Sequence, residues 1–151
     1  MIEIALYEPD IAPNTATILR LAACFDLTVR IIEPAGFAWS QASFRRAGLD
    51  YLDKAKVLRD ASWDAFVGAT AGRRRILMST KAAQPYCNFS FASGDIILLG
   101  RESAGVPNHV HATADARLLI PMQTGMRSLN VALACAMVTG EALRQLNGFP
   151  R

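Results

Sequence analysis

The sequence predicts an α/β protein: a single-domain, mostly parallel sheet with helices on both faces. Short apolar runs alternate with helix-periodic segments along all 151 residues. Two of the apolar runs end in loops that begin at glycine or proline, and open α/β sheets hold their ligands at such strand ends. No repeat, linker or low-complexity segment divides the chain, so residues 1–151 are expected to form one domain.

The first half of the chain contains three expected strands. Asn14 is expected to cap the first helix, because apolar residues recur on one face after it. The expected elements are strands over 2–7, 27–32 and 55–58, a helix from Asn14 through Phe25, a helical piece over 44–47, and a helix capped by Ser62 that runs through Val67.

The second half continues the alternation. The expected elements are strands over 75–79, 96–99 and 117–120, a connection through Pro85 that lacks a strong helix signal, a helical turn over 106–111, and a last helix from Ser128 to about Leu146. Asn147-Gly148 stops that last helix. Residues 129–138 are apolar almost all round, so this helix must be buried on more than one side, within the domain or against a second copy.

Composition limits the cellular setting and the partners. Apolar residues make up 52% and charged residues 19%, an apolar excess that a subunit interface would cover. The net charge of +3 permits a polyanionic partner without requiring one. Cys24 and Cys135, two of three unpaired cysteines, are expected to be buried reduced thiols. The N-terminus lacks a signal-type segment, and the apolar stretch 129–138 is too short to span a bilayer, so a cytoplasmic protein with no membrane partner is expected.

The two loops carry the most information about function. The run 96–99 ends at Gly100 and opens a loop with the charged pair Arg101-Glu102 and a second glycine, Gly105. The run 118–120 ends at Pro121 and opens a loop that leads into the start of the last helix.

These segments resemble the three ordered motifs of the SPOUT class of S-adenosylmethionine-dependent RNA 2′-O-methyltransferases. The matching residues are Asn14 and Arg20 on the first helix, then Gly100, Glu102, Gly105, Val106 and Pro107, then Ile120-Pro121-Met122 with Ser128-Leu129-Asn130. The resemblance covers nearly the whole chain and implies a C-terminal trefoil knot, which the pattern of elements alone does not indicate.

Further segments resemble one subgroup of this class, the short enzymes that methylate the ribose of the tRNA wobble nucleotide. They are Leu6-Tyr7-Glu8-Pro9, Pro13-Asn14, Ile32-Glu33-Pro34 with Gly36-Phe37, and residues 45–51, Arg-Arg-Ala-Gly-Leu-Asp-Tyr. The subgroup implies methylation of position 34, a cytidine or modified uridine, in the anticodon loop of tRNA. It also implies a homodimer and no accessory RNA-binding domain. One position departs from the pattern: Ala104 replaces the usual arginine, and Arg101 stands where proline is common.

The resemblance assigns roles to particular residues. The catalytic set is Asn14, Arg20, Glu102, Ser128 and Asn130; the cofactor-binding set is Met78, Gly100, Glu102, Gly105, Ile120, Met122 and Ser128; the RNA-binding set is Arg20, Arg45 and Arg46. Gly100 fits its role because a residue without Cβ lets backbone approach a ligand closely. Arginine stays protonated in proteins, so Arg20 is expected to grip phosphate and stabilise the developing alkoxide rather than act as a base.

Alternatives remain beside this interpretation. The protein could methylate another tRNA position or ribosomal RNA, or be a non-catalytic RNA-binding member of the fold. The cluster Arg73-Arg74-Arg75 is open between solvated surface and an RNA contact. His109-x-His111 has no third ligand nearby, so no metal is expected. Neither a nucleophile elbow nor a Gly-Lys-Ser/Thr loop is present, which argues against a serine hydrolase and a nucleoside triphosphate site.

Overall fold

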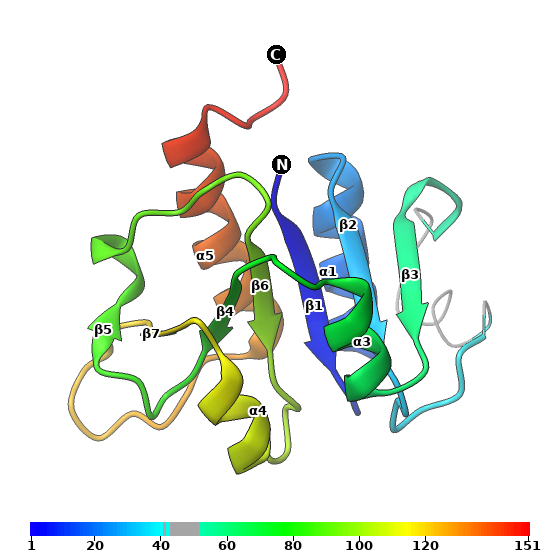
Figure 1. The fold of residues 1–151 in the computed structure, drawn as a ribbon, viewed down its shortest axis with the longest axis horizontal. Helices are drawn as coiled ribbons and strands as arrows, with labels where there is room; N and C mark the ends of the chain where they lie inside the picture. The colour runs from blue at the N-terminus through cyan, green and yellow to red at the C-terminus, as the bar shows by residue number, and fades with distance from the viewer. Residues whose placement is uncertain (41, 43–51) are drawn as a thin grey trace.

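A computed structural model describes residues 1–40, 42 and 52–151 and confirms the expected parallel α/β fold. Seven strands form one sheet in the order β3-β2-β1-β6-β4-β7-β5, and the pairings between these strands are parallel (Figure 1). The strands are β1 Glu3–Tyr7, β2 Thr28–Ile32, β3 Lys56–Asp60, β4 Arg75–Met78, β5 Gln84–Pro85, β6 Ile96–Leu99 and β7 Ala116–Leu119.

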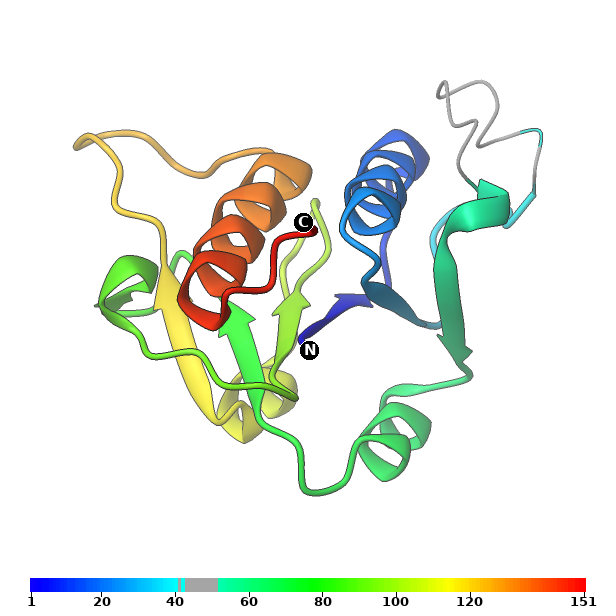
Figure 2. The same cartoon turned by 90° about the horizontal axis from the view of Figure 1, so that it is seen from above.

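Helices cover both faces of the sheet, as expected. They are α1 Ala12–Cys24, α3 Trp63–Ala69, α4 Asn108–Thr113 and α5 Val131–Leu146, with short 3₁₀ turns η1 at Leu52–Lys54 and η2 at Tyr86–Asn88. Helices α1 and α5 lie side by side on one face, and α3 and α4 lie on the other (Figure 2). In the described part of the chain, no helix is long and apolar enough to cross a membrane.

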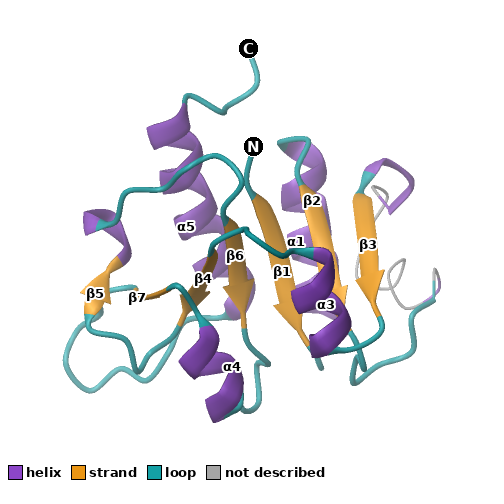
Figure 3. Cartoon of the chain, in the orientation of Figure 1, coloured by secondary structure: helices purple, strands orange, loops and turns teal. Residues whose placement is uncertain are grey.

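Helices lie over both faces of the sheet (Figure 3), and the core has two parts, one on each face. Alternate residues of β1 point to opposite faces, so Ile4 packs in the cluster beneath α1 and α5 while Ala5 packs in the cluster that includes Phe66 of α3. Strands β1 and β6 lie inside the sheet with apolar residues on both faces, which explains the unbroken apolar sequence of β6 and that of β1 after Glu3.

Several expected helix ends are wrong, while Ser62 caps α3 as predicted. Asn14 does not cap α1: the helix begins at Ala12, and Pro13 lies in its first turn, where a missing N–H costs no helical hydrogen bond. Asn130, not Ser128, caps α5, because its Oδ1 accepts hydrogen bonds from the N–H groups of Ala132 (2.8 Å) and Leu133 (3.4 Å).

Further expectations concern the Pro85 connection, the cysteines and the segment 44–47. The short strand β5 lies in the Pro85 connection, where no strand is expected, at one edge of the sheet. Cys24 is exposed rather than buried, whereas Cys135 is buried as predicted. The helical piece expected over 44–47 lies outside the described residues.

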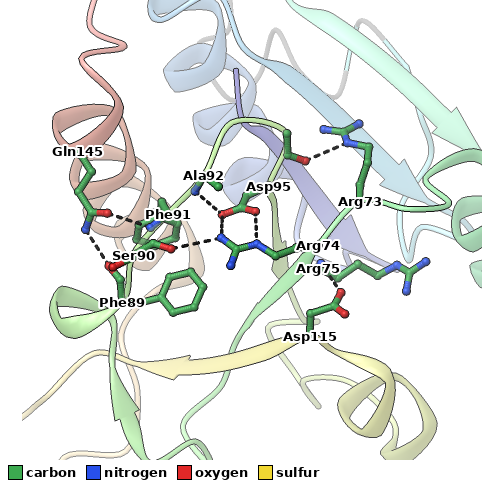
Figure 4. A network of polar contacts seen from close by, with 11 residues as sticks. Arg73, Arg74, Arg75, Phe89, Ser90, Phe91, Ala92, Asp95, Asp115 and Gln145 are labelled. Carbon is green, nitrogen blue, oxygen red and sulfur yellow. Dashed lines mark hydrogen bonds and ion pairs between the residues drawn. The ribbon is translucent and has the colours of Figure 1, made fainter.

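The cluster Arg73-Arg74-Arg75 makes internal contacts at the start of β4 (Figure 4). Arg74 donates through Nε and Nη2 to the two carboxylate oxygens of Asp95, at 2.7 and 2.6 Å, and that carboxylate is buried. Arg73 pairs with Glu3 at 2.9 Å, and the Arg75 guanidinium lies 5.9 Å from the centre of the Phe66 ring. These arginines therefore hold β4 against its neighbours, a role that their sequence did not indicate.

Candidate active site

A cavity of about 960 Å³ opens at the carboxyl ends of β4, β6 and β7. The loops that follow these strands form its walls, together with the starts of α1 and α5. It gathers all the described residues that the resemblance assigns to the cofactor and most of the catalytic set: Asn14, Met78, Gly100, Glu102, Gly105, Ile120, Met122, Ser128 and Asn130. Carboxyl ends of neighbouring parallel strands meet at one edge of a sheet, which is why residues far apart in sequence converge here.

The loop after β6 closes on itself. Arg101 and Gly105 exchange backbone hydrogen bonds of 3.0 and 2.8 Å, and Gly105 has a φ of +63°. A Cβ on Gly100 would lie 2.7 Å from the carbonyl carbon of Gly105. The close approach at Gly100 is therefore made by the loop's own backbone, whereas the sequence suggested a close approach by the ligand.

A side-chain hydrogen bond joins the beginnings of α1 and α5 at the cavity wall. Asn130 donates from Nδ2 to Oδ1 of Asn14 over 3.0 Å, while its own Oδ1 caps α5. Two motif asparagines that are 116 residues apart in sequence are therefore in direct contact at the cavity wall.

Glu102 contacts a residue that the sequence interpretation did not include. The backbone N–H of Asp10 donates to Oε2 of Glu102 over 3.2 Å, and the Ser103 hydroxyl donates to the Asp10 carboxylate. Burial and a hydrogen bond with Asp10 raise the pKa of Glu102, while hydrogen bonds from Glu102 and Ser103 lower the pKa of Asp10. A signal existed: Asp10 closely follows the first strand, at the strand end where ligands bind.

The arginines of the predicted site lie apart from the cavity wall or outside the described residues. Arg20 lies on the exposed side of α1 and does not line the cavity. Arg45 and Arg46 fall in the segment that is not described. Arg101 does line the cavity, and its guanidinium lies 5.6 Å from the centre of the Tyr7 ring. A guanidinium is thus present in the loop despite Ala104, but it packs on an aromatic ring.

Tyr7 forms the base of this contact. Burial, aided by a hydrogen bond with Glu8, raises the pKa of Tyr7 to about 12. An aromatic face attracts a cation, so the contact holds the Arg101 guanidinium, and with it the loop after β6, against the end of β1.

His111 is a cavity residue to which the sequence interpretation assigned no role. Its Nε2 is buried and has no hydrogen-bond partner among the described residues, and the residue lines the cavity. Within the same part of the chain, no three His, Cys, Asp or Glu side chains are grouped as metal ligands.

The cavity fits the cofactor that the resemblance implies. Apolar walls suit an adenine ring, and polar side chains such as Asn14 and Asn130 suit a ribose or an amino acid group. The volume of about 960 Å³ is within the range of small-molecule sites.

Known proteins match this chain over nearly its whole length. The sequence profile of the SpoU rRNA Methylase family matches residues 1–140. A tRNA (cytidine(34)-2′-O)-methyltransferase of Beijerinckia indica is 56% identical, with 98% of this chain and 94% of the relative aligned. The protein of that name from Escherichia coli K12 is 40% identical over 99% of this chain and 96% of its own.

A solved structure has the same architecture. It is described as "Structural insights into the 2-OH methylation of C/U34 on tRNA", and it superposes with a TM-score of 0.93 at 36% identity, covering 98% of this chain and 97% of its own. The AdoMet complex of the SpoU methyltransferase AviRb from Streptomyces viridochromogenes superposes with a TM-score of 0.85 at 22% identity, covering 99% of this chain and 59% of its own, and shares the fold. The chain therefore belongs to the SpoU rRNA Methylase family.

Proposed function

We propose that this protein transfers a methyl group from S-adenosylmethionine to the 2′-oxygen of the wobble nucleotide, position 34, of tRNA. The relatives named for this reaction align over almost their full lengths. The observation that carries the proposal is the cavity at the ends of β4, β6 and β7, because it collects every residue that the motifs assign to the cofactor. The nucleotide is a cytidine or a modified uridine, and the reaction takes place in the cytoplasm.

The reaction requires the sulfonium methyl and the ribose oxygen to be aligned, and positioning supplies much of the acceleration. S-adenosylmethionine supplies the methyl group when it is bound. The backbone around Met78, Gly100 and Ile120 holds the cofactor. Ser128 and Asn130, at the start of α5, orient it and the substrate ribose with Asn14.

The test is an assay with radiolabelled S-adenosylmethionine and bulk tRNA, followed by mapping of the modified ribose. We expect label on the 2′-oxygen of position 34. Label on another tRNA position or on ribosomal RNA alone would show a different substrate. Cofactor binding without transfer to any RNA would support the non-catalytic RNA-binding alternative, and the absence of cofactor binding would contradict the proposal itself.

Arg20 serves the chemical step by gripping the phosphate next to the reacting ribose and stabilising the developing alkoxide. Its position outside the cavity supports a role away from the cofactor. The variant Arg20→Ala should lower kcat by at least about a hundredfold and leave the Kd for S-adenosylmethionine within a few-fold. Arg144→Ala, near the C-terminal end of α5, is the control and should retain the wild-type kcat and Kd. If Arg20→Ala lost cofactor affinity to the same extent as kcat, Arg20 would be a cofactor-binding residue instead.

The working unit is a homodimer, with Arg45 and Arg46 of one subunit holding RNA phosphates near the cavity of the other. Large apolar side chains are exposed along the start of α5 and the loop before it: Met126, Leu129, Leu133 and Met137. We expect the interface to include α1 as well as α5, with Leu21, Leu133 and Met137 as candidates, although Leu21 is partly buried within the chain. An exposed apolar patch of this kind marks a surface that a second chain covers.

A further inference from the structure

Asp10, to which the motifs assign no role, lies where three segments of the chain meet. Its backbone donates to Glu102 over 3.2 Å, and its carboxylate accepts from Ser103. From the other side, the N–H of Gly36 donates to the Pro9 carbonyl over 2.8 Å, and a Cβ on Gly36 would lie 2.7 Å from the Cβ of Asp10. Asp10 is therefore held between the segment after β2 and the cavity loop after β6.

These contacts connect two walls of the cavity. Asp10 is two residues before α1, which carries Asn14, and Glu102 belongs to the loop that closes between Arg101 and Gly105. The partners are 92 residues apart in sequence, and the other bond of Asp10 goes to the same loop through Ser103. The contacts of Asp10 therefore set how far the loop stands from the start of α1.

We propose that Asp10 is a positioning residue for the methyl transfer: acting through Glu102 and Ser103, it holds the 100–105 loop against the start of α1. This inference rests on the proposed function, because it takes the cavity between those walls as the S-adenosylmethionine site. When the link is absent, the loop and α1 are no longer kept at a fixed separation, and the cofactor binds more weakly.

The side chains of Asp10 and Glu102 also act on each other. The interaction with Glu102 lowers the pKa of Asp10, and burial, followed by the interaction with Asp10, raises the pKa of Glu102. These opposite shifts favour a proton on Glu102 rather than on Asp10. A raised pKa in the folded protein means that Glu102 loses this proton, and with it the favourable interaction with Asp10, as the pH rises through its folded pKa. Two adjacent carboxylates then repel each other.

Charged groups on the surrounding segments have other partners. Glu8, on the same loop as Asp10, and Arg101, next to Glu102, both act on Tyr7. Glu33, after β2, accepts a 2.6 Å hydrogen bond from Nε of Arg59. The described groups that shift the pKa values of the pair are the two carboxyls themselves, Ser103 and the local backbone.

The experiment measures the Kd for S-adenosylmethionine by isothermal titration calorimetry, without RNA, from pH 4.5, the ordinary pKa of a glutamate, upward. The variants are Asp10→Asn, Asp10→Ala and Ser103→Ala, with Asp64→Asn, on exposed α3 surface, as the matched control. Dividing each Kd by that of Asp10→Asn at the same pH cancels the titration of the cofactor's own groups. Thermal unfolding without cofactor checks that each variant is folded.

Relative to Asp10→Asn, the wild type and Asp64→Asn should lose affinity as the pH rises. In Asp10→Asn the amide donates to ionised Glu102 without a shared proton, so this variant is the reference whose affinity changes only with the titration of the cofactor. Asp10→Ala should bind about tenfold more weakly than the wild type at the low end, which is the loss expected for a charged hydrogen bond. Ser103→Ala should weaken binding in the same direction and tests the link if Asp10→Ala does not fold.

The inference is overturned if Asp10→Asn keeps the pH dependence of the wild type, or if folded Asp10→Ala or Ser103→Ala binds as tightly as the wild type. A wild type that binds no S-adenosylmethionine at any pH would instead contradict the proposed function. The two failures are thus distinguishable.

Discussion

At the scale of single residues, the site depends on how closely backbone segments approach one another. Gly100 is required because a Cβ there would overlap the backbone of Gly105, and Gly36 is required because a Cβ would overlap Asp10. In both places the contact is between two parts of the protein. The glycines therefore shape the backbone around the cavity.

The variant Gly100→Ala should weaken S-adenosylmethionine binding by at least about tenfold, because relieving the 2.7 Å contact moves the loop. Calorimetric titration measures the affinity, and urea unfolding shows that the fold survives. Gly68→Ala is the control: nothing lies within 4 Å of the new Cβ, so the helix should gain about 0.5–1 kcal/mol with unchanged binding. Unchanged affinity in Gly100→Ala would mean that the loop does not touch the cofactor.

At the scale of secondary-structure elements, α1 and α5 are joined at their first turns. Asn130 uses its Oδ1 to cap α5 and its Nδ2 to bond Asn14 of α1 over 3.0 Å. One side chain thus begins one helix and aligns it with another. The two helices cover the same face of the sheet (Figure 2). The bond between Asn130 and Asn14 therefore also positions the starts of both helices at the cavity.

The variant Asn130→Ala should lower the free energy of unfolding by about 1–2 kcal/mol, because it removes the cap and the bond to Asn14. Asn14→Ala should lower the free energy of unfolding by about 0.5–1.5 kcal/mol, because it removes the same hydrogen bond. The double variant loses that bond only once, so its loss should be smaller than the sum of the two single losses by about 0.5–1.5 kcal/mol. Urea unfolding measures all three, with Asn88→Ala, on exposed surface, as the control. Strictly additive losses would show that the hydrogen bond contributes nothing.

At the scale of the whole molecule, the apolar surface of α5 bears on assembly. The last helix was expected to be buried on more than one side, yet Leu133 is 58% exposed and Met137 is 41% exposed in the single chain. Of the two alternatives that the sequence left open, burial within the domain is wrong for this side of the helix. Cover by a second copy stays a prediction.

Sedimentation of the wild type should give twice the 16.4 kDa mass of the chain. Leu133→Glu places a charge on the exposed apolar surface of α5, so this variant should sediment with the mass of one chain. Leu58→Glu is the control, because Leu58 is also exposed but lies on the edge strand β3, away from α5. If the active sites are composite, mixing Arg20→Ala chains with chains changed at Arg45 and Arg46 should restore activity. A wild-type monomer that remains fully active on dilution would exclude the dimer as the working unit.

The sequence by itself determined the order and type of most elements, because these depend on local patterns. Apolar runs identified β1, β2, β4 and β6, Ser62 identified the start of α3, and the motifs identified the cavity residues. Local patterns were weaker at element ends, where Asn14 and Ser128 are as suitable for capping as Asn130. The trefoil knot, which only the resemblance implies, stays a prediction.

Only the tertiary structure decided which of these local features meet. Strand β6 lies between β1 and β4, so the loops after β1 and β6 adjoin and Asp10 reaches Glu102, 92 residues away. The same long-range pairing places the exposed guanidinium of Arg74 on the buried carboxylate of Asp95. Partner choice depends on strand order, which is set by packing of the whole chain and leaves no trace in the residues next to each side chain.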